Sequence, residues 1–199
     1  HLPVQSGSDT VLKRMKRDYT IVEYLERLGR LREARPDIAV TTDIIVGFPG
    51  ESDEDFEKTL KLCESVRYDG QFAFVYSPRP KTVAALKEDE WGSVPHEVKV
   101  HRLERLNQSQ KRVSFELMDR LVGQTVEVLV EGRSRTNAAK RFGRTSQNRV
   151  VNFDGNAPVG ALCTVAIETA SNSSLGGRQA QILSLPCVEI AEVQVSEDS

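Results

Sequence analysis

The sequence predicts two architectures in one chain: an α/β segment with a parallel sheet, followed by a small antiparallel β-barrel. Over residues 1–120, β-rich apolar stretches alternate with amphipathic stretches of helical period, which indicates βαβ units. Three strands would leave a sheet with open edges, so we expect it to be part of a larger sheet or barrel. After Gly123, short strand-like stretches are separated by Gly, Asn, Ser and Asp, which is the pattern of a small antiparallel barrel.

The composition is that of an ordinary globular protein. The 199 residues are 39% hydrophobic and 28% charged, and the formal net charge is −2. This balance gives no overall attraction for nucleic acid or membrane, so any such attraction must be local. No apolar run approaches the length of about 20 residues that crosses a bilayer, and we expect no membrane partner.

Cysteine and histidine spacing predicts no metal site in this chain. Cys63, Cys163 and Cys187 are far apart, which argues against a disulfide framework and suits the reducing cytoplasm. Iron–sulfur clusters need closely spaced thiolates, so each cysteine is expected to fill apolar space instead. The three histidines likewise lack the spacing of metal ligands.

The α/β segment contains three expected strands and four expected helices. The strands are expected at residues 1–5, 38–48 and 71–77, and the helices at 10–17, 20–36, 52–66 and about 95–120. Thr20 and Glu23 have the spacing of a capping box at the start of the second helix. The buried face of that helix is expected to comprise Ile21, Leu25, Leu28 and Leu31.

The third and fourth helices are expected to be amphipathic. Ser52 is the expected N-cap of the third helix, whose inner stripe comprises Phe56, Leu60, Cys63 and Val66. The fourth helix is basic, and its cations could face RNA or be solvated. These cations are Lys99, Arg102, Arg105, Lys111 and Arg112. In the solvated arrangement the residues that pack inward are Leu103, Leu106, Val113 and Leu117.

The second architecture carries local positive charge. Its strands are expected at 125–132, 149–155 and 161–171, and it carries seven basic residues against four acidic ones. The segment after Leu183 contains four acidic residues and no Lys or Arg, which is typical of a solvated tail. The sequence therefore predicts domains at 1–120 and 121–184, followed by an acidic tail at 185–199.

Four segments of the chain, read together, resemble a known enzyme family. They are HLPVQSGSDTVLKRMKRDYT, TTDIIVGFPGESDEDFEKT, FVYSPRP and GRTSQNRVVNF, in this order. Over about residues 1–182 they closely resemble the C-terminal part of the radical S-adenosylmethionine methylthiotransferases. One departure is RPKTVA, where Lys81 and Val83 replace the glycine and proline of the usual RPGTPA. The shape of this loop is therefore less certain than the family.

The resemblance implies a fold made of half of a radical SAM (TIM-like) barrel followed by a TRAM domain. The whole enzyme would bind S-adenosylmethionine and two 4Fe–4S clusters, one in an N-terminal domain and one in the barrel. HLPVQ resembles the fourth strand of the six-stranded barrel, so we expect an upstream part to be missing. All the cluster-ligating cysteines of the family are absent here, and the chain is not expected to catalyse the reaction alone.

The resemblance also implies a function in tRNA modification. The opening segment is most similar to members that methylthiolate C2 of N6-isopentenyladenosine at position 37 in the anticodon stem-loop. That reaction needs an electron donor for cluster reduction and takes place in the cytoplasm. Two sister activities modify threonylcarbamoyladenosine in tRNA or an aspartate of a ribosomal protein. A further alternative is that the chain is a stand-alone RNA-binding module.

Candidate cofactor-binding residues follow or interrupt the expected strands of the α/β segment. They are Gln5, Ser6, Asp43, Gly47 and Arg79. In a parallel barrel, functional residues gather at the carboxyl ends of the strands. A buried carboxylate such as Asp43 needs a ligand, a cavity or a partner, and a strand-end arginine suits a carboxylate or phosphate.

Each candidate also has a structural alternative. Gln5 and Ser6 could belong to an N-cap cluster in which Ser8 or Asp9 is the cap. Asp43 could make a structural hydrogen bond, and Arg79 an ion pair that holds its loop. Gly47 and Gly50 could permit ligand approach or only form the turn, while Glu51 could be a ligand or a helix cap.

Candidate RNA-binding residues surround the polar turn of the second domain. They are Lys140, Arg141, Phe142, Arg144 and Arg149. The cations would contact phosphates, which contributes affinity rather than sequence choice. Phe142 is the candidate for stacking on an unpaired base, whereas Phe153 is expected in the core.

Overall fold

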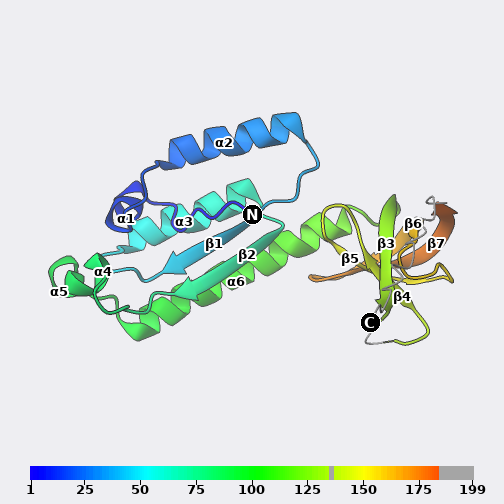
Figure 1. Ribbon diagram of the computed structural model, residues 1–199. Coiled ribbons are helices and arrows are strands. Elements are labelled where there is room, and N and C mark those ends of the chain that lie inside the picture. The colour runs from blue at the N-terminus through cyan, green and yellow to red at the C-terminus, as the bar shows by residue number, and fades with distance from the viewer. Residues whose placement is uncertain (135–136, 184–199) are drawn as a thin grey trace, which may run out of the picture.

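The computed structural model describes residues 1–134 and 137–183, and the expected acidic tail at 185–199 lies outside the described residues. Figure 1 shows an α/β part and a β-barrel joined by the long helix α6 (His96–Asp119). The prediction of half of an α/β barrel followed by a small β-barrel is therefore confirmed. No helix in the described part of the chain is both long enough and apolar enough to cross a membrane.

The α/β part contains a parallel strand pair and helices on one side of it. β1 (Thr41–Val46) and β2 (Gly70–Val75) pair in parallel, with Thr41 opposite Gly70 and Val46 opposite Val75. The other helices are α1 (Asp9–Arg14), α2 (Ile21–Ala34), α3 (Asp53–Val66), α4 (Val83–Leu86) and α5 (Glu88–Trp91). The two strands correspond to the second and third strands expected from the sequence.

The first expected strand, residues 1–5, lies beside β1 but forms only one bridge. The Leu2 N–H donates to the Thr41 carbonyl and the Gln5 N–H to the Asp43 carbonyl, at 2.8 and 2.9 Å. Gln5 forms a parallel bridge with Ile44. The Val4 N–H, which is next in the ladder, donates to the Thr42 hydroxyl at 3.0 Å instead of a carbonyl, and a φ of 68° at Gln5 turns the chain away. The segment nevertheless runs parallel to β1, as the sequence predicts.

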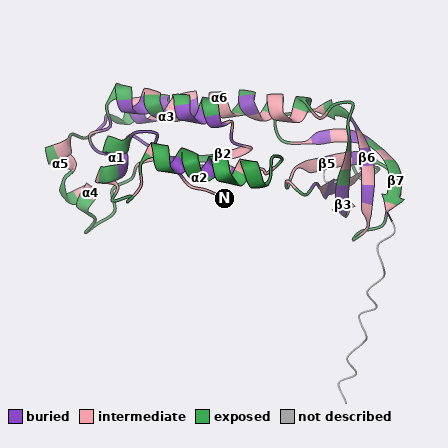
Figure 2. Ribbon diagram, turned by 90° about the horizontal axis from the view of Figure 1, so that it is seen from above, coloured by how far each residue is buried: buried purple, intermediate pink, exposed green. Residues whose placement is uncertain are grey.

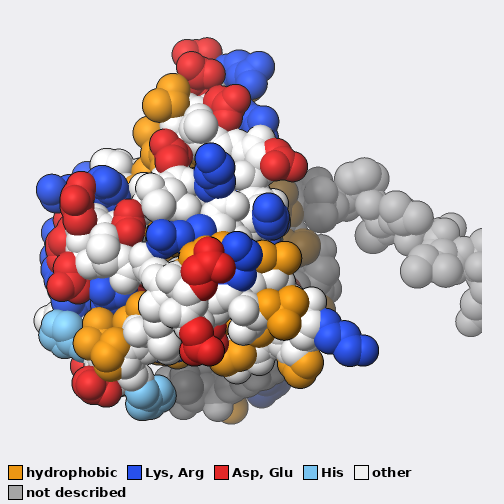
Figure 3. Space-filling view, turned by 90° about the vertical axis from the view of Figure 1, so that its left-hand side faces the viewer, with side chains coloured by type: hydrophobic (Ala, Val, Ile, Leu, Met, Phe, Trp, Pro, Cys, Tyr) orange, Lys and Arg blue, Asp and Glu red, His pale blue; other side chains and the backbone are white. Residues whose placement is uncertain are grey.

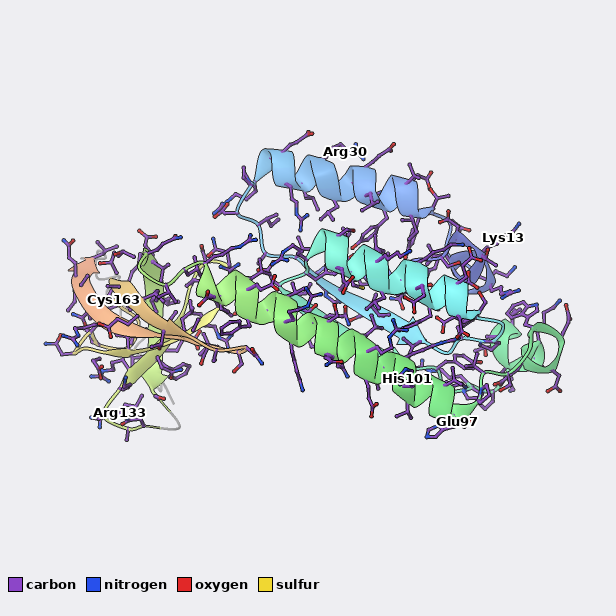
Figure 4. The ribbon with its side chains drawn as sticks, turned by 180° about the vertical axis from the view of Figure 1, so that it is seen from behind. Lys13, Arg30, Glu97, His101, Arg133 and Cys163 are labelled. Atoms are coloured by element: carbon purple, nitrogen blue, oxygen red, sulfur yellow. The ribbon has the colours of Figure 1, made fainter. Side chains whose placement is uncertain are left out.

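Helices cover one face of the sheet and leave the other open. Along β1, Thr42, Ile44 and Val46 are buried, while the alternate residues are partly exposed. The buried core joins these strand residues to apolar side chains of α2, α3 and α6. Figure 4, seen from behind, shows α6 in front of the sheet, and Figure 2 shows α3 and α6 together along one side.

The predicted helix starts are confirmed, and the predicted inner face of α2 is correct for Ile21 and Leu28 but wrong for Leu25 and Leu31. Capping boxes are present at Thr20 in α2 and at Ser52 in α3. In α2 the buried residues are Tyr24 and Leu28, whereas Leu25 and Leu31 are each 40% exposed. Tyr24 takes the inward position because its hydroxyl donates to the Leu2 carbonyl and accepts from the Tyr68 hydroxyl.

The expectation that the basic face of α6 is solvated or faces RNA is wrong for Lys99 and Arg102. Both side chains are buried, and each has a partner inside the fold. Arg102 binds Glu51, and Lys99 lies over the ring of Tyr76. A sequence pattern of cations cannot distinguish a solvated stripe from cations that meet partners on another element.

The second part is a closed barrel of five described strands. They are β3 (Thr125–Arg133), β4 (Arg141–Arg144), β5 (Val150–Asp154), β6 (Leu162–Ala170) and β7 (Leu175–Leu183). Their order around the barrel is β3-β4-β5-β7-β6. β4 and β7 were not expected from the sequence, whereas Phe153 lies in the barrel core as predicted.

The barrel is not wholly antiparallel. Four pairings are antiparallel, but β5 and β7 pair in parallel, with Val151 opposite Leu175. This arises because β7 returns from β6 to close the barrel beside β5 and runs in the same direction. The prediction of an all-antiparallel barrel is corrected on this point.

An ion pair holds the barrel against the amino edge of the α/β sheet. Arg149 Nη2 lies 2.8 Å from Asp69 Oδ1, and both side chains are 17% exposed. Asp69 precedes β2, and its other carboxylate oxygen accepts from the Val40 N–H just before β1. Gln147 adds a hydrogen bond to Asp37 at 2.8 Å. One carboxylate therefore fixes both the strand starts and the barrel.

We expect Asp69→Asn to loosen the barrel from the α/β part, because the mostly buried Arg149 loses its charged partner. The coupling in a double-mutant cycle with Arg149→Gln should be about 1 kcal/mol, read from thermal unfolding. Glu168→Gln, which removes an exposed ion pair with Arg178, is the matched control and should have no effect. Equal effects of Asp69→Asn and Glu168→Gln would contradict the role of the interdomain pair.

Candidate functional site

The segments that follow the strands meet at the carboxyl edge of the sheet. Gln5 ends the first segment, Gly47 follows β1, and Tyr76 follows β2. Gly47 and Tyr76 lie at this edge because β1 and β2 are parallel neighbours, whereas Gln5 bridges Ile44 within β1. Figure 3 looks onto this end of the molecule and shows basic, acidic and apolar side chains intermixed.

Gly47 is required by both backbone conformation and space. Its φ is +68°, a conformation that side-chain-bearing residues rarely adopt, and a Cβ there would lie 2.3 Å from Lys99 Cγ. Its N–H donates to Glu51 Oε2 at 2.7 Å. Gly47 thus brings the backbone after β1 into direct contact with α6.

Glu51 and Arg102 form a buried ion pair behind this turn. Glu51 Oε2 lies 2.7 Å from Arg102 Nη1, and the two side chains are 0% and 5% exposed. Burial raises the pKa of Glu51, while the Gly47 N–H and Arg102 act in the opposite direction. Arg102 also binds Asp53 in the first turn of α3 at 2.7 Å. Glu51 therefore stabilises the turn after β1. The sequence alone could not decide between a ligand role and a capping role for this residue.

An aromatic group that the sequence did not predict closes the edge. Phe48 packs edge-on against Tyr76 at 5.0 Å between ring centroids, and it also contacts Trp91. Lys99 Nζ lies 5.3 Å from the centre of the Tyr76 ring. The Tyr76 hydroxyl is buried and has no hydrogen-bond partner among the described residues. A polar ligand at this edge could supply that missing partner.

Gln5 and Ser6 occupy different environments at the start of the edge. Gln5 is 9% exposed and bonds to β1 through both backbone groups. Ser6 is fully buried, and its hydroxyl lies 3.3 Å from that of Thr59 on α3. Thr59 also accepts from the Gly7 N–H at 2.9 Å. Ser6 thus contributes to the site by fixing the loop, with its hydroxyl turned toward the protein.

Ser8 does not cap its own helix. It occupies the N-cap position of α1, but its hydroxyl donates to Asp55 Oδ1 at 2.6 Å instead. Burial alone would raise the pKa of Asp55, but the hydrogen bonds from Ser8 and Ser52 outweigh it and lower that pKa. This interaction joins the first loop to the start of α3.

Asp43 and Arg79 remain accessible. Asp43 lies on the open face of β1, 31% exposed, with Oδ2 3.3 Å from His1 Nε2. Arg79 lies in the exposed loop after β2, and its guanidinium has no hydrogen bond or ion pair with any described residue. The Arg79 guanidinium is therefore free to meet a ligand, and Asp43 is accessible to one although His1 contacts one of its oxygens.

The candidate RNA-binding residues lie on or near the β3–β4 hairpin, whose outer end carries Arg133 in Figure 4. The Arg141 guanidinium has no partner within the described part of the chain, while Lys140 makes an ion pair with Asp154 at 3.3 Å. The half-buried Phe142 ring lies over Gly132 in β3. Arg144 lies 3.4 Å from Glu131, and both remain partly exposed. These four residues share one strand and its preceding turn.

Arg149 lies apart from the other candidates because it is held in the interdomain ion pair with Asp69. It faces the α/β part and is only 17% exposed. Because Arg149 is close to Arg144 in the sequence, the two are grouped together there, and nothing in the sequence indicates that Arg149 faces the α/β part.

The described residues do not fit an iron–sulfur cluster. They contain no group of three or more His, Cys, Asp or Glu side chains placed to hold a metal ion. Cys63 and Cys163 are buried in the cores of different domains. Burial raises the pKa of Cys63 to about 12, so its thiol stays protonated. Cys187 lies outside the described residues.

We expect Gly47→Ala to destabilise the fold by at least about 2 kcal/mol, because a side chain would strain the backbone and displace Lys99. Gly29→Ala is the matched control: nothing lies within 4 Å of a Cβ on this residue of α2. That variant should gain up to about 1 kcal/mol from helix propensity. Urea unfolding followed by Trp91 fluorescence measures both, and a neutral Gly47→Ala would contradict the assignment.

We expect Ser8→Ala to raise the pKa of Asp55 toward its ordinary value. A lowered carboxyl pKa contributes stability above about pH 4, and this is lost as the pH falls through the folded-state pKa. The variant should therefore lose about 2 kcal/mol at neutral pH and less in acid. NMR titration of Asp55 is the direct measurement. Ser65→Ala, which removes a hydroxyl bonded only to the Leu62 carbonyl, should leave that pKa unchanged.

Models of two known families match two separate parts of the chain. The model of the radical SAM superfamily matches residues 1–63, and the model of the TRAM domain matches residues 119–179. The first match contains the loop of Ser6 and the turn of Gly47, and the second contains the β3–β4 hairpin. The order of these domains agrees with the fold.

Curated relatives match nearly the whole chain. A tRNA-2-methylthio-N(6)-dimethylallyladenosine synthase of Myxococcus xanthus is 63% identical over 197 residues, which cover 99% of this chain and 43% of the relative. Synthases of the same name from Anaeromyxobacter dehalogenans and Nitrosospira multiformis are 54% and 50% identical over 89% of this chain. The chain spans less than half the length of these relatives. It belongs to the radical SAM methylthiotransferase family of these synthases and carries a TRAM domain.

Proposed function

We propose that this chain is part of an enzyme that methylthiolates C2 of N6-dimethylallyladenosine in tRNA. The observation that carries the proposal is 63% identity, across 99% of the chain, with a synthase of that name. The substrate and activity are those of the whole enzyme, to which this chain contributes the carboxyl edge of a sheet and a barrel. The described residues hold no cluster ligands, so the chain is not expected to act alone.

The chemistry explains why such an enzyme needs more than acid–base residues. The C2–H bond of adenine is not acidic enough for an ordinary base, so hydrogen must leave by a radical route. Bound S-adenosylmethionine supplies the radical and the methyl group in this family. The contribution of this chain is therefore binding, orientation and electrostatics.

We assign the carboxyl edge to S-adenosylmethionine. Gln5, Gly47 and Arg79 would surround it, with Ser6 holding the loop in place and Asp43 lying between the cosubstrate and the substrate base. The support is the close backbone approach at Gly47, the unpartnered guanidinium of Arg79 and the buried, unpartnered hydroxyl of Tyr76. A free strand-end guanidinium suits the carboxylate of the amino-acid part.

We assign the β3–β4 hairpin to the tRNA anticodon stem-loop. Lys140, Arg141 and Arg144 would contact phosphates, and Phe142 would stack on an unpaired base. A modified adenosine at position 37 is already in a loop, so its presentation costs less than flipping from a duplex. An electron donor and a cytoplasmic location complete the proposal.

Nucleoside mass spectrometry of total tRNA, from source cells with and without the gene, tests this function. Deletion should remove 2-methylthio-N6-dimethylallyladenosine and accumulate the form without the methylthio group. Re-expression should restore the modified nucleoside.

Unchanged levels of that nucleoside would overturn the proposal. Loss of the methylthio form of threonylcarbamoyladenosine, or of the modified ribosomal aspartate, would identify a sister activity instead. If none of the three changes, but the purified chain binds tRNA, the chain is an RNA-binding module.

A further inference from the structure

Two phenylalanines project from the face of the sheet that the helices leave bare. Phe72 and Phe74 on β2 are 55% and 54% exposed. Their register partners on β1 are Asp43 and Ile45. These four residues, together with Thr41, are called the open face below.

The chain spans less than half the length of its curated relatives, so the bare face is the one that a complete α/β barrel would enclose. On the opposite side of β1, Ile44 and Val46 are fully buried. Side chains on the inner face, near the carboxyl ends of barrel strands, are placed to line a ligand site.

The open face combines apolar and polar recognition at one place. Asp43 and Phe72 are directly opposite each other, so they lie about 5 Å apart in the direction of the strand hydrogen bonds. His1 spans this pair: Nε2 lies 3.3 Å from Asp43 Oδ2, and its ring packs edge-on against Phe72 at 6.2 Å. Phe74 lies two residues further, about 6.6 Å toward the carboxyl edge.

We infer that the open face recognises the N6-dimethylallyl group of the substrate adenine. This inference rests on the proposed function and identifies residues that distinguish the substrate from unmodified adenosine. The group is a branched five-carbon chain attached to a nitrogen that keeps one N–H. Phe72 and Phe74 form the apolar wall for the chain, and Asp43 is the adjacent acceptor for the N–H.

The order of the residues along the strands fits this occupant. The aromatic pair extends from mid-strand to the carboxyl edge, where the cosubstrate is assigned. A substituent beside Phe72 and Asp43 leaves the purine ring nearer to Phe74 and to that edge. Neither the adenosine nor the amino-acid part of S-adenosylmethionine carries a branched apolar group that would need both rings.

The test is equilibrium binding of this chain to two anticodon stem-loop RNAs that differ only in the dimethylallyl group at position 37. Fluorescence anisotropy should show tighter binding of the prenylated RNA by at least about fivefold. Phe72→Ala and Phe74→Ala should each reduce that ratio severalfold, because the prenylated RNA loses more affinity than the unprenylated RNA. Phe115→Ala is the matched control, because Phe115 is 43% exposed but lies on α6.

Several outcomes would overturn the inference. Equal binding of the two RNAs by the unaltered chain would do so, while leaving RNA binding, and hence the proposed function, intact. A ratio that is lost equally in Phe115→Ala would point to a general effect on the fold. An equal loss of affinity for both RNAs in the Phe72 and Phe74 variants would mean that the rings contact RNA without recognising the prenyl group. Absence of binding to either RNA would reject the tRNA assignment as well.

Discussion

The buried pair of Glu51 and Arg102 determines where the carboxyl edge of the sheet lies. Glu51 accepts a hydrogen bond from the Gly47 N–H in the turn after β1. Arg102 on α6 forms ion pairs with Glu51 and with Asp53 at the start of α3. One interaction thereby joins a strand end, a helix start and the long helix. Removal of either partner would leave an uncompensated charge in the core, which is strongly destabilising. The turn at Gly47, the contact with Lys99 and the aromatic group around Phe48 all depend on this arrangement.

The single covered face of the sheet has consequences for function. α3 and α6 bury one side, and the other side carries Asp43, Phe72 and Phe74 in positions open to a ligand. The barrel meets the opposite, amino edge through Asp69 and Arg149. α6 joins the two ends, and its 24 residues span about 36 Å. An RNA that contacts the β3–β4 hairpin and also presents a base at the open face must run along the sheet.

Local signals in the sequence were sufficient for most of the α/β part. Thr20 and Ser52 begin helices through capping boxes. The side chain of each accepts a hydrogen bond from the backbone N–H three residues later, and the side chain of that later residue accepts one from the backbone N–H of Thr20 or Ser52. This spacing is fixed, so it is visible in the sequence. The strand at β1 has a continuous apolar run, and the glycine after it marks the turn. The sequence could not predict which residue pairs with each charged side chain. Lys99, Arg102 and Arg149 look like surface cations in the sequence, and only the packing of distant elements turns them inward.

The barrel was predicted less completely because its glycines conceal two strands. β7 begins Leu175-Gly176-Gly177, which resembles a loop, yet a Cβ on Gly177 would lie 2.2 Å from the Ala166 carbonyl oxygen. Gly143 in β4 is equally close to the Leu129 carbonyl. These strands need glycine because their neighbours approach closely, which also lowers the apparent β-propensity. From the sequence, candidate site residues could be proposed only near the ends of the expected strands. No pattern in the sequence distinguished Tyr76, Trp91 and Phe72 from ordinary core residues.

The central claim is that one RNA contacts both the β3–β4 hairpin and the open face. Hydrogen–deuterium exchange of the chain, with and without a prenylated anticodon stem-loop, tests it most directly. The account predicts that RNA slows exchange in two separate segments, residues 139–144 and residues 71–76, and leaves the exposed helix α2 unchanged. Slower exchange in the hairpin alone would contradict it, because the sheet would then take no part in RNA recognition.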